Sequence, residues 1–142
     1  MDHPLTNRRD WLAIAAAAFL AANLLHGADH VRQGVDDVGV AVKIGGALLT
    51  VAAIEVFRRR RHPGAALLAT IVGFTAAVAV VASHVAPHWS ILSDSYLDDV
   101  SPDALSWAVM LAEVAAGFML GVVGLRRLER TAPRPVTAGS VR

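Results

Sequence analysis

Residues 65–86 read AALLATIVGFTAAVAVVASHVA, a run of 22 residues in which His84 is the only ionisable side chain. A helix needs about 20 mainly apolar residues to cross about 30 Å of hydrocarbon, so this run is long enough to span a membrane. A surface helix of a soluble bundle would carry polar residues along one face. This run is apolar all round, and it therefore predicts a transmembrane helix.

Three further apolar runs have a similar length and lie at residues 11–28, 38–57 and 105–125. The whole chain is 55% hydrophobic and 18% charged, which excludes an ordinary soluble domain. The sequence thus predicts an all-α integral membrane protein, a four-transmembrane-helix bundle within residues 1–130. The segment 131–142 has no periodic pattern and is predicted to be a disordered cytoplasmic tail.

The arginines gather on one side of the predicted bundle. Eleven of the 12 lie before the first run, between the second and third, or after the fourth. The other two connections hold Arg32 against seven of the nine aspartates. Because arginines near the ends of spans are retained on the cytoplasmic side, both termini are predicted to be cytoplasmic, in a multi-pass protein of the cell membrane.

The composition also limits the chemistry and the partners. The chain has no cysteine, which excludes a disulfide framework and a thiolate metal site, but its six histidines and 12 acidic residues can supply nitrogen and oxygen ligands. No basic patch with interleaved aromatic residues is present, so nucleic acid is not an expected partner. The expected partners are the lipid bilayer and either further copies of the chain or a larger membrane complex.

Two histidine pairs lie at the outer ends of the first and third runs, His26 with His30 and His84 with His88. Residues at i and i+4 share one face of a helix, about 6 Å apart along its axis. Such a pair of imidazoles can bind one metal ion. Pro87 weakens the second pair, because a proline can end the helix and turn His88 away from His84.

The carboxylate of Glu113 is expected at about the same depth in the membrane as His84. Counted from the interfacial Trp89 and Trp107, His84 lies about 7–8 Å and Glu113 about 9 Å below the outer surface. His26 and His84 are expected to be the core ligands because they lie deeper, and His30 and His88 to be auxiliary ligands at the interface. The candidate metal ligands are His26, His30, His84, His88, Glu113 and Asp29.

Other polar residues have simpler explanations. Lys43 and Glu113, both in the outer half of the membrane, are explained equally well as a buried ion pair that fixes the register of two helices. Glu55 precedes Arg58 and Arg59 by three and four residues, a spacing that predicts local ion pairs. Three glycines are interpreted as marks of close helix packing, Gly117, Gly121 and Gly124.

The function predicted first is a metal-binding membrane protein with a histidine-rich site near the outer membrane face, in metal handling or redox chemistry. Imidazole and carboxylate ligands without thiolates suit zinc, copper or iron. The second hypothesis is a b-type haem protein for electron transfer, with His26 and His84 as axial ligands. The third is an accessory subunit of a larger membrane complex with no chemistry of its own. The sequence leaves open whether the chain is an enzyme.

Overall fold

The structure, a computed structural model, describes residues 10–34, 37–87, 95–97 and 102–131. Its regular secondary structure across these residues is helical, and it contains no strand there. It has four helices, α1 (Trp11–Arg32), α2 (Asp37–Arg59), α3 (Gly64–His84) and α4 (Ala104–Thr131). All four are long and apolar enough to cross a membrane, which confirms the predicted all-α chain of four such helices. His88 and the predicted tail from residue 132 onward lie outside the described residues.

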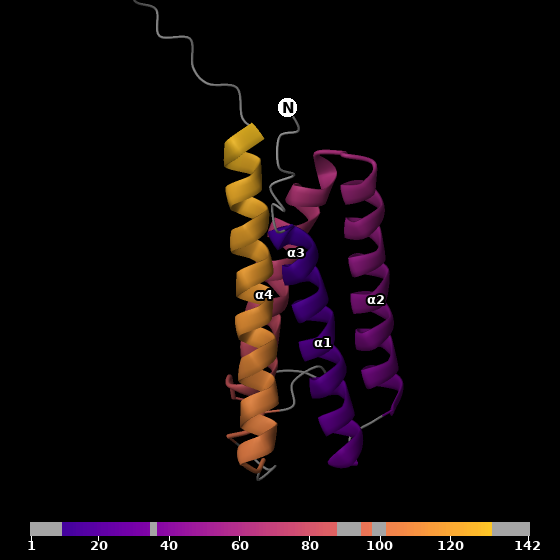
Figure 1. The fold of residues 1–142 in the computed structure, drawn as a ribbon. Coiled ribbons are helices and arrows are strands. Elements are labelled where there is room, and N and C mark those ends of the chain that lie inside the picture. Colours follow the sequence, from indigo (N-terminus) through magenta and orange to yellow (C-terminus); the bar gives the residue numbers. More distant parts are fainter. Residues whose placement is uncertain (1–9, 35–36, 88–94, 98–101, 132–142) are drawn as a thin grey trace, which may run out of the picture.

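The helices form a bundle in which successive helices run in opposite directions (Figure 1). Each helix packs against the next along the chain, and α4 packs back against α1, so that α1 and α3 lie diagonally across the bundle. At one end α2 passes into α3 and α4 finishes; this end carries Arg58, Arg59 and Arg127 and is called the arginine end. The opposite end, where α1 and α3 finish, is called the histidine end.

The distribution of apolar side chains is the one expected of helices in lipid. Large hydrophobic residues point outward on every helix, and the exposed fractions of Val42, Leu49 and Val78 reach 70%, 75% and 69%. A soluble monomer rarely exposes so much contiguous apolar surface. The interior holds mainly alanines with a few larger residues such as Leu12, Phe19 and Leu120. The fold is therefore compatible with a multi-pass membrane protein.

Glycines bring the backbones of α3 and α4 into contact. A Cβ atom added to Gly73 would lie 2.5 Å from the carbonyl oxygen of Gly117, and one added to Gly124 would lie 2.7 Å from that of Ala66. Gly121 faces the ring of Phe74 in the same seam. The packing role predicted for the glycines of α4 is thus met, and Gly73 is the partner on α3 that the sequence did not single out.

Ion pairs tie the helices together at the arginine end. The Nε atoms of Arg58 and Arg59 each lie 2.6 Å from a carboxylate oxygen of Glu55, as the sequence predicts. Arg58 also reaches Asp10, which precedes α1, at 2.6 Å. Asp10 accepts a hydrogen bond from the backbone N–H of Ala13 and caps the first turn of α1. Glu55 therefore has a structural role at the end of the bundle far from the histidines.

Candidate metal centre

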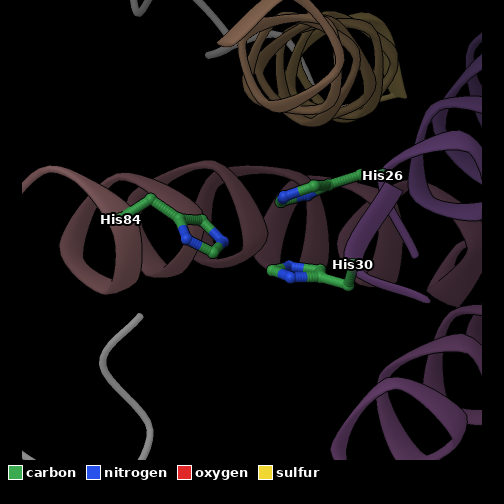
Figure 2. Close-up of side chains that lie close together, drawn as sticks. All are labelled: His26, His30 and His84. Atoms are coloured by element: carbon green, nitrogen blue, oxygen red, sulfur yellow. The ribbon is translucent and has the colours of Figure 1, made fainter. Parts of the chain in front are cut away.

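Three histidines, called the histidine cluster below, meet in the interior near the histidine end. His26 and His30 come from α1 and His84 from α3, and their exposed fractions are 4%, 2% and 1%. The ring centroids are 4.6 Å apart for His26 and His30, 4.8 Å for His26 and His84, and 5.2 Å for His30 and His84. Figure 2 shows the His84 ring facing the other two. One ring nitrogen from each residue lies within 4.8 Å of the others.

Helix geometry explains how the cluster forms. His26 and His30 are one turn apart on α1 and share a face. The sequence placed His30 at the interface, but α1 continues to Arg32 and His30 is buried with His26. His84 is the last residue of α3, which ends before Pro87 as that residue's effect on a helix predicts. Since α1 and α3 are diagonal in the bundle, the three rings meet in its core.

Glu113 of α4 lies beside the histidine cluster and forms hydrogen bonds with two side chains of α1. Its Oε2 atom accepts a hydrogen bond from Nδ1 of His26, and its Oε1 atom accepts one from Nδ2 of Asn23 at 2.8 Å. With a carboxylate as the acceptor, Nδ1 of His26 carries a proton, which leaves Nε2 as the ring nitrogen that could bind a metal. Among the described residues, that buried Nε2 atom has no hydrogen-bond partner. In metal sites a carboxylate commonly orients a ligating histidine through this kind of hydrogen bond.

Tyr96 borders the cluster from the connection between α3 and α4. Its ring centroid lies 4.7 Å from that of His84, and its backbone N–H donates a 2.9 Å hydrogen bond to the carbonyl oxygen of His84. Its ring also meets Trp107 edge to face, with centroids 5.4 Å apart. Sequence reasoning missed Tyr96 as part of the site, because a residue in an aperiodic connection carries no signal of where its ring will lie.

Asp29, a candidate ligand in the sequence, is turned away from the cluster into a different network. Its carboxylate accepts hydrogen bonds from Nε of Arg32 at 2.7 Å and from Nε2 of Gln33 at 2.5 Å. Arg32 in turn reaches Asp103, just before α4, and Ser106 of α4, each at 3.0 Å. Asp29 therefore holds the end of α1 against the start of α4.

Asp103 lies in the same network, immediately before α4. Its carboxylate accepts a 3.0 Å hydrogen bond from the backbone N–H of Ser106, which makes it the N-terminal cap of the helix. This hydrogen bond, together with the nearby Arg32 guanidinium, holds the pKa of Asp103 below its ordinary value.

Lys43 and Glu113 line one cavity but do not pair. The side chain of Lys43 is exposed, and within the described part of the chain no ion pair joins it to Glu113. Both carboxylate oxygens of Glu113 are already engaged by His26 and Asn23. The buried ion pair expected as an alternative is therefore not formed, although the two residues lie at a similar depth.

The structure thus brings together four of the six candidate ligands, His26, His30, His84 and Glu113. Asp29 is bound elsewhere, and His88 lies outside the described residues. A scan of protein-family models, a search of curated proteins and a search of solved structures found no match to this chain.

Proposed function

We propose that this chain is a membrane metalloprotein that binds one transition-metal ion through His26, His30 and His84, with Glu113 as the positioning carboxylate. The observation that carries the proposal is the convergence of three buried imidazoles from two helices, with ligand atoms within 4.8 Å of one another. Three imidazoles brought this close together form a donor set that a single transition-metal ion can share.

The donor set fits a first-row transition metal. In a tetrahedral zinc site with bonds of about 2.0–2.1 Å, ligand nitrogens are roughly 3.4 Å apart, so small side-chain rotations bring the cluster to coordination distance. Three imidazoles leave one coordination position open, as in catalytic rather than structural zinc sites. Without thiolates, zinc, copper and non-haem iron are the candidate ions, with metal handling or redox chemistry as the role.

A haem is less well supported by the same geometry. Axial ligation by His26 and His84 would place the macrocycle between their rings. The His30 ring lies 4.6 Å from that of His26 and 5.2 Å from that of His84, so it occupies the neighbourhood that the porphyrin would need. A single ion uses all three rings, whereas a haem would leave one without a role.

The proposed setting is the cell membrane, with both termini in the cytoplasm and the histidine cluster under the outer surface. The arginines at the arginine end support this orientation, because positive residues are retained on the cytoplasmic side. Reporter fusions after residue 142 and within the connection at residue 96 are expected to report opposite sides of the membrane. Two fusions on the same side would overturn the orientation and leave the metal site untouched.

Metal content tests the function directly. We expect the protein, purified in detergent without chelators and then supplied with zinc, to bind one ion per chain by elemental analysis. His26→Ala, His30→Ala and His84→Ala should each lose the ion. His62→Ala is the matched control, because His62 is an exposed histidine at the arginine end and should leave binding intact.

An absorption spectrum of the same preparation separates the alternatives. A haem would give an intense Soret band that disappears in His26→Ala and His84→Ala but not in His30→Ala. If the wild-type chain binds neither a metal ion nor haem, or if all three histidine variants bind zinc as the wild type does, the metal site is refuted and the accessory-subunit hypothesis takes its place.

A further inference from the structure

A cavity of about 270 Å³ adjoins the histidine cluster. Its walls come from α1, α2 and α3, and Glu113 is the residue of α4 that reaches it. Most of the wall is apolar, with Phe19, Ile44 and Val72 among the larger side chains. This volume is close to the lower end of the range for small-molecule sites, which begins at about 300 Å³. The cavity therefore suits a small, mainly apolar ligand.

One cation lines this apolar space. Lys43 is the only lysine in the chain, and its exposed side chain shows where the cavity reaches the protein surface. The turn of α2 that carries it crosses α1 at Gly27, where an added Cβ atom would lie 2.8 Å from Cδ1 of Ile44. Lys43 thus lies at about the level of His26 along the bundle.

The cation lacks an anionic partner within the described residues. No ion pair joins Lys43 to any described carboxylate, and the one carboxylate that shares the cavity, Glu113, is occupied by His26 and Asn23. A charged residue inside a membrane-spanning helix is costly unless it finds a partner, and such residues commonly mark the path or site of a ligand. The charge that would complement the cavity is therefore negative.

We propose that this cavity binds a small anionic amphiphile, an alkyl carboxylate, whose carboxylate pairs with Lys43 and whose chain lies along the apolar wall of α1, α2 and α3. The histidine cluster lines the same cavity, so the bound molecule would lie beside the three imidazoles. The inference rests on the proposed function only in placing the ligand beside a bound metal. Lys43 and the cavity would bind the ligand without a metal.

The unique lysine supplies a specific reporter for this proposal. Reductive methylation with ¹³C labels Lys43 and keeps its charge. The labelled protein is placed in nanodiscs of zwitterionic lipid and titrated with decanoate, and with decanol as the neutral ligand of equal chain length. We expect decanoate to shift the Lys43 methyl resonance in a saturable manner and decanol to leave it unchanged. A response to decanol equal to that of decanoate would overturn the proposal, since it would reflect only a change in the bilayer.

Two variants of α3 test whether the ligand occupies the cavity. Ala76→Phe fills the lined space, whereas Val78→Phe adds the same ring to an outward position that is 69% exposed and lies outside the lining. The decanoate shift should disappear in Ala76→Phe and persist in Val78→Phe. Equal shifts in both variants would place decanoate on the outer surface of the protein and refute the cavity as its site.

Substitution of Lys43 does not disturb the packed interior and gives an independent measurement. With [1-¹³C]decanoate observed instead, Lys43→Met should weaken binding by about tenfold or more, and Lys43→Arg should preserve most of it. Unchanged affinity in Lys43→Met would exclude the ion pair. A Lys43 resonance that depends on protein concentration without decanoate would assign the cavity to a second copy of the chain and overturn the proposal.

Each titration is run with a chelator and again with zinc, so that the two proposals fail separately. The decanoate shift with the chelator present supports the cavity site whether or not the metal binds. Zinc binding by a protein that ignores decanoate would refute the amphiphile alone, and decanoate binding by a protein that ignores zinc would refute the metal site alone.

Discussion

Replacing Glu113 by Gln should weaken metal binding through the loss of a single charge. The carboxylate accepts hydrogen bonds from both His26 and Asn23, whereas a glutamine offers one acceptor and one donor. The Asn23 amide can rotate to accept from that new donor, because its buried Oδ1 atom has no partner among the described residues. Both hydrogen bonds then survive in Glu113→Gln, and the negative charge behind the His26 ring is what disappears.

The size of the effect follows from the burial of Glu113, which is 5% exposed and therefore poorly screened by solvent. Changes to a group that orients a metal ligand weaken binding about 10–100-fold, or about 1.4–2.8 kcal/mol. Glu113→Ala should weaken it further, because it also removes the acceptor that fixes the tautomer of His26. The measurement is a competition titration of the detergent-solubilised protein against a chromophoric zinc chelator.

Glu55→Gln is the matched control, since it also removes one carboxylate charge from one of the four long apolar helices but lies at the arginine end. It should bind zinc with wild-type affinity. If Glu113→Gln also binds zinc as tightly as the wild type, Glu113 does not support the ligand and the assigned role of its contact with His26 is wrong. An equal loss in both variants would point to a general weakening of the bundle.

Three further predictions concern stability, measured by thermal unfolding in detergent. Gly73→Ala should lower the free energy of unfolding by about 1–3 kcal/mol, because its Cβ would lie 2.5 Å from a backbone oxygen of α4. Gly45→Ala has nothing within 4 Å of the added atom and should be neutral or stabilising. Equal losses of stability in the two variants would contradict the close packing of α3 and α4. Because the pKa of Asp103 is lowered, its contribution to the stability of the fold is complete at neutral pH and is lost as the pH falls below about 4. Asp103→Asn should therefore show a shallower acid-induced drop in melting temperature than the wild type. An identical drop would exclude the capping role of Asp103. Lys43→Met and Glu113→Gln should have additive effects, because the two side chains do not pair; a double variant milder than the sum would restore the ion pair.

The four helices were predictable because each apolar run is long enough to cross a membrane by itself. The ends of the helices were harder to predict, since a helix can continue through polar residues when these form hydrogen bonds or ion pairs with one another. At the end of α1, Asp29 and Arg32 pair at 2.7 Å, and the helix extends past the apolar run and buries His30. The sequence assigned His30 to the interface because it follows a charged residue, without the information that this charge is neutralised locally.

Position along each helix was a good guide to which residues meet, but it did not decide which of two partners Glu113 would contact. Counting residues placed Glu113 level with the histidines, and both line one cavity. The same count left two partners open for Glu113, either Lys43 or the histidines, and the structure brings it to His26. Gly73 was missed for a related reason, because a lone glycine in an apolar run does not reveal which helix will approach it.

The order of synthesis sets the order in which this site is assembled. Helix α1 is synthesised before the other three helices, so His26 and His30 are present as a pair before His84 and Glu113 exist. His84 joins them only after α2, which carries none of the cluster, and most of α3 have been made. At that stage all three imidazoles are present, but Nδ1 of His26 still lacks its acceptor. Helix α4 is translated after the other three and brings Glu113, so the contact that orients the His26 ring is the last part of the proposed site to form.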